Sequence, residues 1–100
     1  MEFDWDEGKR KRNIDKHQVD FLDAALIFEG AVVVEEDARL AYGEARYRAI
    51  GLVDGEFMVV TYTLRGSVCR LISARKGGRR DRRRYQESIV GGDPRDERSG

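Results

Sequence analysis

The sequence predicts an α+β protein with two N-terminal helices, a mostly antiparallel sheet of about four strands and a C-terminal helix. Three observations support this prediction. Capping acids and helically spaced apolar residues fill the first third of the chain, β-branched and alternating stretches fill the middle, and a basic, helix-compatible segment follows the last strand. A chain of 100 residues is long enough for one domain with a small core.

Two capping acids define the predicted N-terminal helices. Asp6 can accept hydrogen bonds from backbone N–H groups, and the helix that it starts is expected to run to about His17. Residues 3–5 before it alternate apolar and polar types, as in a short edge strand or a cap on the core. Asp20 is the predicted cap of the second helix, which Gly30 ends.

The middle of the chain predicts a strand, an exposed loop and then a three-stranded meander. The predicted strands are 31–34, 46–53, 56–64 and 68–74, with the loop at 35–43. Asp54-Gly55 is a strong signal for a two-residue hairpin turn, and Arg65-Gly66 is predicted to form the next turn. A last helix is expected at 79–88. The predicted domain is 1–90, followed by a disordered tail at 91–100, which contains no hydrophobic residue.

The register of the meander follows by counting if both turns have two-residue loops and neither strand pair contains a bulge. Arg48, Thr61 and Arg70 then form one cross-strand row. Arg46, Thr63 and Val68 form the next row on the same face. The opposite face is expected to be buried under helices, and its rows are Ala49, Val60 and Leu71, then Tyr47, Tyr62 and Cys69.

Charge is strongly segregated along the chain although the formal net charge is zero. Residues 65–84 contain nine Lys and Arg and one acid, whereas residues 19–64 contain nine acids and three bases. Such a basic segment indicates a polyanion site, most simply for nucleic acid, and the alternative interpretation is a solvated charged helix. The predicted RNA-binding residues are Lys9, Arg48, Arg75, Lys76, Arg79, Arg82 and Arg83.

Several classes of protein are not supported by the composition. Cys69 is the only cysteine, so no disulfide or Cys-based metal cluster is expected, and the residue is predicted to be a small buried side chain. No apolar run is long enough to span a membrane, and the N-terminus lacks a signal-peptide core, so a cytoplasmic protein without a membrane partner is expected. The sequence shows no convincing site for a metal or another cofactor.

Arginine, lysine, histidine and tyrosine are sufficient to cleave RNA without a metal ion. The 2′-hydroxyl attacks the adjacent phosphate, and the protein supplies positioning, charge stabilisation and proton transfer. The predicted catalytic residues are Arg65, Arg70, His17 and Tyr85. His17 has an alternative role as the C-terminal cap of its helix, and Tyr85 as a packing residue with a hydrogen-bonded hydroxyl. A binding module for RNA or the ribosome without chemistry is the competing function.

The chain resembles the BrnT family, the toxin half of a bacterial type II toxin–antitoxin system, from Phe3 to about Glu87. The matching residues are Phe3, Trp5, Asp6, Lys9, Asn13, Lys16, His17, Val19, Phe21, Ala24, Tyr42, Gly43, Glu44, Arg46, Gly51, Arg65, Gly66, Arg70, Ile72, Ser73, Ala74, Arg75, Lys76, Asp81, Arg82, Arg83 and Tyr85. The sequence departs from the family pattern at Gln18, where Gly is usual, at Gly77-Gly78, where Ala-Thr is common, and at Asp81, where Glu is usual.

The resemblance implies a RelE-like ribonuclease fold and inhibition of translation by cleavage of mRNA, free or on the ribosome. It implies a BrnA-type antitoxin with a ribbon-helix-helix domain. The complex would bind operator DNA only through this antitoxin. We also expect a phosphate near Arg48, Arg65 and Arg70, because arginines on adjacent strands repel unless an anion lies between them. An acidic or amphipathic segment of the antitoxin is expected near residues 75–84.

Overall fold

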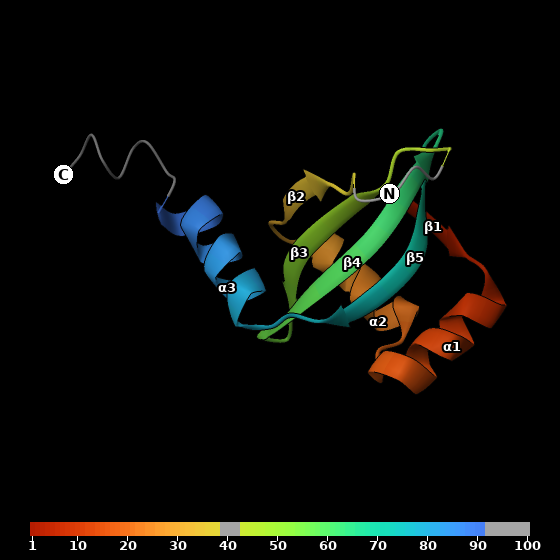
Figure 1. The fold of residues 1–100 in the computed structure, drawn as a ribbon, viewed down its shortest axis with the longest axis horizontal. Coiled ribbons are helices and arrows are strands. Elements are labelled where there is room, and N and C mark those ends of the chain that lie inside the picture. The colour runs from red at the N-terminus through yellow and green to blue at the C-terminus, as the bar shows by residue number, and fades with distance from the viewer. Residues whose placement is uncertain (39–42, 92–100) are drawn as a thin grey trace.

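The computed structural model describes residues 1–38 and 43–91, and within them five strands form one mixed sheet in the order β1-β5-β4-β3-β2 (Figure 1). The elements, in chain order, are β1 (Glu2–Trp5), α1 (Glu7–His17), α2 (Phe21–Ala24), the 3₁₀ helix η1 (Ala25–Glu29), β2 (Val33–Glu36), β3 (Tyr47–Val53), β4 (Glu56–Arg65), β5 (Val68–Lys76), α3 (Arg79–Gln86) and the π-helical turn η2 (Glu87–Gly91). The predicted α+β class is confirmed. The fifth strand is β1, which pairs in parallel with β5, whereas the other neighbours are antiparallel.

The N-terminal helices start where the capping acids predict. Asp6 accepts a hydrogen bond from the Lys9 N–H, and Asp20 accepts one from the Leu22 N–H. The second helical segment is less regular than predicted, because its α-helical part ends at Ala24 and continues as η1. Gln18 closes α1 with a left-handed φ of 57°, a conformation that glycine adopts at lower cost.

The core lies between the sheet and the layer formed by α2 and η1, which Figure 1 shows behind the strands. Its largest fully buried side chains are those of Phe21, Ile27, Leu71, Val60 and Cys69. The face predicted to be buried is therefore the buried face. Cys69 is fully buried, which confirms the expectation of a small buried side chain, and burial raises the pKa of its thiol to about 11.

The predicted register is correct for the first hairpin and wrong for the second. Val53 faces Glu56 across Asp54-Gly55, and Arg48 faces Thr61, as counted. In the second hairpin Arg65 is the last residue of β4 and pairs with Val68, so the turn is Gly66-Ser67. This shift by two residues places Arg70 opposite Thr63.

A β-bulge changes the second hairpin further. Ser73 pairs with Thr61 and Leu71 pairs with Tyr62, so Ile72 is the extra residue of β5. The predicted row of Arg48, Thr61 and Arg70 does not exist, and neither do the predicted pairs of Thr61 with Arg70, Val60 with Leu71 or Tyr62 with Cys69. Arg70 nevertheless stays on the predicted face, because a shift by two residues preserves the alternation of side chains.

The predicted loop at 35–43 begins two residues too early. Glu35 and Glu36 belong to β2 and face Arg48 and Tyr47 of β3. The Glu35 carboxylate accepts a hydrogen bond of 2.9 Å from the Arg48 guanidinium, so a cross-strand ion pair holds these residues in the strand. The rest of the predicted loop falls partly on residues 39–42, outside the described residues.

The C-terminal helix begins at the predicted residue, Arg79. Its helical conformation continues through η2 to Gly91, and residues 92–100, most of the predicted tail, lie outside the described residues. Asp81 compensates for the weak cap at Gly78, because its carboxylate accepts the Gly78 N–H at 2.9 Å. Among the described helices, none has both the length and the apolar composition of a membrane span.

An ion pair ties α1 to the start of α2. The Arg10 guanidinium donates two hydrogen bonds of 2.8 Å to the Asp20 carboxylate, one to each oxygen. This contact is the main cause that lowers the pKa of Asp20 below its ordinary value of 3.8, and it raises the pKa of Arg10. The pair therefore joins the cap of α2 to the preceding helix.

The lowered pKa predicts how Asp20 affects stability at different pH values. A carboxyl group with a lower pKa in the folded state contributes its full stabilisation above its unfolded pKa, and this contribution is lost as the pH falls through the folded pKa. We expect Asp20→Asn to destabilise the protein at pH 7 and to have a smaller effect at pH 3. Urea unfolding of both proteins at the two pH values measures this, and an equal difference at both values would contradict it.

Candidate nucleic-acid interface

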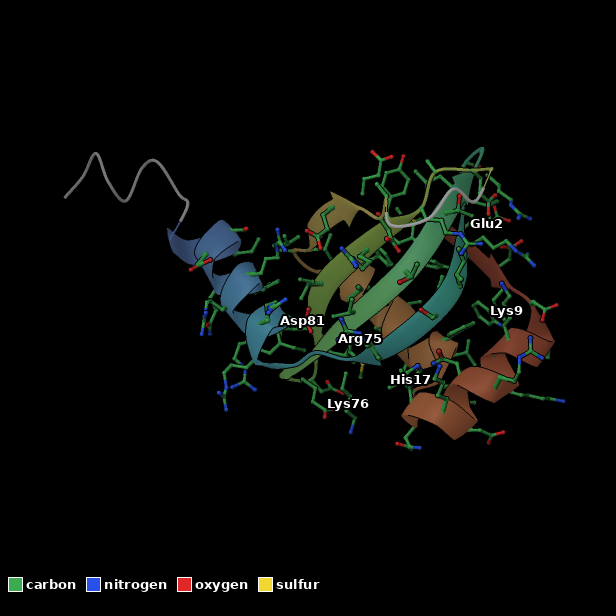
Figure 2. The ribbon with its side chains drawn as sticks, in the orientation of Figure 1. Glu2, Lys9, His17, Arg75, Lys76 and Asp81 are labelled. Atoms are coloured by element: carbon green, nitrogen blue, oxygen red, sulfur yellow. The ribbon has the colours of Figure 1, made fainter. Side chains whose placement is uncertain are left out.

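One face of the sheet remains open between α1 and α3. We call it the open face and define it by Arg48, Thr61, Arg70, Ser73 and Arg75, which project away from the core. Three of these residues come from β5, because the bulge at Ile72 returns Ser73 and Arg75 to the same side as Arg70. In Figure 2, Arg75 lies in front of the sheet between His17, at the end of α1, and Asp81, at the start of α3.

A hollow of about 320 Å³ separates α1 from β5 at one side of the open face. We call it the α1 groove, and its lining residues are Lys9, Arg12, Asn13, Lys16, His17, Ile72 and Ser73. None of the described residues that line it is acidic. Within the described part of the chain, no ion pair neutralises its lysines, its arginine or His17. The groove is thus a site of uncompensated positive charge.

Lys9, Asn13 and His17 follow one another at intervals of four residues, and this helical spacing predicts that they share one face of α1 with Trp5 just before them. All three line this groove, whereas Trp5 packs against Phe21 with ring centroids 6.2 Å apart. The sequence reasoning did not select Arg12 and Lys16. Their spacing of three and seven residues from Lys9 is the helical signal that identifies the same face.

Asn13 fixes the position of α1 against the sheet. It is 6% exposed, and its amide nitrogen donates to the carbonyl oxygens of Val19 and Ala74, at 2.8 Å each. Its amide oxygen accepts the Ala74 N–H at 3.0 Å. β1 pairs with β5 only as far as Leu71, so the Asn13 side chain replaces a strand where the edge of β5 would otherwise lack partners.

A second hollow, of about 190 Å³, lies where α3 meets the open face. We call it the arginine pocket, and its lining residues are Glu35, Arg48, Ile50, Val59, Arg75, Arg80, Asp81 and Arg84. Glu35 bridges Arg48 at 2.9 Å and Arg84 at 3.1 Å, while Asp81 holds Arg75 at 2.8 Å. The hydrogen bond from Arg75, with a second one from Gly78, lowers the pKa of Asp81. Four guanidinium groups against two carboxylates leave the pocket positive, and Arg80 has no ion pair within the described chain.

The α1 groove and the arginine pocket adjoin along β5. Ser73 lines the first and Arg75 lines the second, and both side chains project from the open face. Two residues along a strand span about 7 Å, so one extended polyanion can reach both hollows. Glu35, Arg80 and Arg84 are the residues of this surface that the sequence reasoning missed. Only Arg80 and Arg84 had a sequence signal, namely their place in the basic segment.

The predicted catalytic arginines lie toward the other end of β5. Arg65 ends β4 at the hairpin, 3.5 Å from Glu44, and Arg70 lies 3.2 Å from Asp4 of the neighbouring strand β1. With Arg48 bound to Glu35, each of the three arginines expected to share one phosphate has a carboxylate of its own. The repulsion that predicted a phosphate between them is therefore absent from the structure.

The remaining predicted RNA-binding residues lie on α3 or at the end of β5. Lys76 pairs with Glu56 at 3.4 Å, and Arg82 lies over the Phe57 ring with its guanidinium carbon 5.5 Å from the centroid. Arg79 and Arg83 are exposed on the helix. Lys76 and Arg82 line a separate hollow with Glu56 and Phe57, and none of these four basic residues lines the arginine pocket. Within the described residues, no group of three His, Cys, Asp or Glu side chains has the arrangement of a metal site.

Tyr85 has the position of a packing residue. Its ring is buried against Phe57, Ile50 and Val59, and its hydroxyl donates to the carbonyl oxygen of Ala31 at 3.2 Å. The hydroxyl is therefore engaged between α3 and the segment before β2. This arrangement agrees with the packing alternative weighed for Tyr85.

We expect Tyr85→Phe to keep full RNA cleavage and to lose about 1 kcal/mol of stability, the net contribution of one hydrogen bond. Cleavage rates and urea unfolding measured on the same preparation check both parts. Tyr85→Ala serves as the comparison, because loss of the ring from this small cluster should destabilise the protein by about 3–5 kcal/mol. A folded Tyr85→Phe protein without activity would show that the hydroxyl takes part in the chemistry.

The fold and this surface define a class: small α+β proteins with a basic, open sheet face suited to a polyanion. The comparison with protein families gives the particular family. Residues 5–81 match the model of BrnT, the ribonuclease toxin of a type II toxin–antitoxin system, so the chain belongs to the BrnT family. No curated protein matches the sequence significantly.

Family membership confirms the resemblance seen in the sequence and its main functional consequence. The protein is a ribonuclease toxin, and this decides against the module that binds RNA without chemistry. The type II class also implies an RNA substrate and a cognate antitoxin. The matched segment includes α1, strands β2 to β5 and the first residues of α3. It therefore contains the open face, the α1 groove and, apart from Arg84, the lining of the arginine pocket.

Proposed function

We propose that this toxin cleaves RNA without a metal ion, on the open face, with the reacting phosphate in the α1 groove. The single observation that supports this best is the composition of the groove, whose lining residues include no acid. His17 lies there among three cationic side chains that have no ion pair with any described residue. Histidine is the residue type suited to gain and lose a proton near neutral pH. Its cationic neighbours favour the extra negative charge of the transition state.

The proposed reaction uses the RNA's own 2′-hydroxyl. Its oxygen bonds to the adjacent phosphorus while the bond from phosphorus to the 5′-oxygen of the next nucleotide breaks. The 2′-hydroxyl loses a proton and the leaving oxygen gains one, so the products carry a 2′,3′-cyclic phosphate and a 5′-hydroxyl. We assign one of these proton transfers to His17 and the stabilisation of the phosphate to Lys9, Arg12 and Lys16.

The arginine pocket is proposed to hold a neighbouring phosphate of the same strand. Arg75 and Arg80 supply the charge, while Glu35 and Asp81 orient the guanidinium groups of Arg48 and Arg75. Arg70 extends the open face toward β1. Arg79, Arg82 and Arg83 add attraction at longer range, which salt should weaken. In this arrangement Arg65 lies outside the reacting centre.

The substrate proposed is mRNA, free or on the ribosome, so the activity is placed in the cytoplasm, where it inhibits translation. The antitoxin proposed is of the BrnA type with a ribbon-helix-helix domain. Operator DNA would then be bound through the antitoxin only, because the open face is assigned to RNA. These proposals rest on family membership together with the basic open face.

The proposed chemistry is tested with purified toxin, RNA and excess EDTA. We expect cleavage to continue at an unchanged rate and to leave 2′,3′-cyclic phosphate and 5′-hydroxyl ends. An RNA that carries 2′-O-methyl groups at every position is the matched control and should remain intact. Cleavage that stops with EDTA and returns with Mg²⁺, or fragments with 3′-hydroxyl ends, would contradict the proposal. If free RNA is not cut, the same assay on translating ribosomes distinguishes a ribosome requirement from inactivity.

A further inference from the structure

A further hollow on the molecule has mostly apolar lining residues and is separate from both basic hollows. It has a volume of about 440 Å³ and lies between β1 and the helical layer of α2 and η1. Met1, Phe3 and Trp5 line one side, and Leu22, Leu26 and Phe28 line the other. We call it the apolar groove. RNA cleavage on the open face makes no use of it.

Several large apolar side chains that line this groove are exposed to solvent. Met1, Leu22 and Leu26 are 78%, 56% and 43% exposed, and all three border this one groove. An exposed cluster of large apolar side chains in a groove indicates an interaction surface. β1 is also an edge strand, whose outer edge has no strand partner among the described residues. Such an edge can accept an extended segment of another protein.

The charge around the apolar groove defines what it can bind. The segments that form it, residues 1–7 and 20–29, contain seven acids and no Lys or Arg. Arg10 pairs with Glu7 and Asp20, and Arg70 pairs with Asp4, so four of the seven acids have no ion pair among the described residues: Glu2, Asp6, Asp23 and Glu29. Glu29 lines the groove itself, and Glu7 accepts the Trp5 indole N–H at 3.4 Å. A nucleic acid is repelled by this surface, whereas a segment with apolar residues flanked by Lys or Arg is attracted to it.

We propose that the apolar groove is a docking site for the cognate antitoxin, which inserts an extended, apolar segment flanked by basic residues alongside β1. The type II class requires such a protein partner, and a second copy of this chain is a poorer fit because the groove would meet its own acidic segments. The contact is separate from the acidic antitoxin segment expected near residues 75–84. It leaves the chemistry on the open face unchanged, so it does not depend on the proposed mechanism.

The test uses the full toxin and its cognate antitoxin, co-expressed and purified, with Leu22→Glu, Leu26→Glu and the double variant. We expect the double variant to lose at least tenfold in affinity by calorimetry, to escape neutralisation in a growth assay and to cleave RNA like the wild type. Val34→Glu is the matched control, because Val34 is 47% exposed on β2, at the opposite edge of the sheet from β1. It should bind the antitoxin normally.

Retained cleavage shows that the variants are folded, and a thermal melt provides the same control if the wild type proves inactive. Antitoxin affinity unchanged in the folded double variant would overturn the proposal. Self-association of the wild type that the double variant abolishes, with antitoxin affinity unchanged, would overturn it in favour of a toxin dimer. Asp23→Lys tests the charge argument separately and should weaken binding more at low salt than at high salt.

Discussion

We expect His17→Ala to lower the rate constant of RNA cleavage by about 10²–10⁴-fold, the usual contribution of a positioned acid or base. The loss should appear in kcat and leave KM nearly unchanged, because His17 is assigned to proton transfer. Arg80→Ala, in the arginine pocket, should instead act mainly on KM, because that pocket is assigned to a neighbouring phosphate and not to the reacting one. Single-turnover cleavage at several toxin concentrations separates the two effects.

The control for His17 is Lys11→Ala, an exposed residue of α1 that does not line the groove. It should retain wild-type cleavage. The competing role of His17 is a cap at the negative end of α1, whose removal costs about 0.3–1 kcal/mol of stability. A His17→Ala protein with that loss of stability and an unchanged kcat would establish the capping role and contradict the catalytic one.

Asn13→Ala should produce the largest loss of stability among the polar residues of α1. Removing the amide leaves the N–H and C=O of Ala74 and the carbonyl of Val19 without this partner, and unsatisfied buried groups cost about 1–3 kcal/mol each. We expect a total of about 3–5 kcal/mol, allowing for partial rescue by water. Urea unfolding measures it.

Asn13→Asp is the informative companion variant. It is nearly isosteric and can still accept the Ala74 N–H, but it cannot donate to either carbonyl. Its loss of stability should therefore approach that of Asn13→Ala. A loss below 1 kcal/mol for both variants would show that α1 is held by its apolar contacts, and the groove would then not depend on Asn13.

The parts of the fold that depend on local chemistry were predictable. Asp6 and Asp20 cap the helices that they were expected to cap, and Asp54-Gly55 forms its turn, because each signal acts over a few residues. The bulge at Ile72 was not predictable. Nothing in the local sequence distinguishes Ile72 from its neighbours. The bulge lies two residues before Ala74, whose backbone contacts Asn13 of α1, and this tertiary contact has no local signal.

The same division applies to the candidate site. The row of Lys9, Asn13 and His17 was found because helical spacing alone places these residues together. The arginine row failed because it required a correct register across two hairpins. Glu35 was missed for a related reason. It contacts Arg48 because β2 pairs with β3, and no local sequence pattern predicts that pairing.

RNA is proposed to lie across the open face, from the α1 groove to the arginine pocket. The most direct test of this placement is an NMR titration of labelled toxin with a mixed-sequence RNA that carries 2′-fluoro groups and therefore cannot be cleaved by 2′-hydroxyl attack. We predict the largest amide shifts at residues 72–75, at the end of α1 and at Arg48, with little change in α2 and η1. Largest shifts in α2 and η1, or at the Gly66-Ser67 turn, with none at residues 72–75, would contradict it.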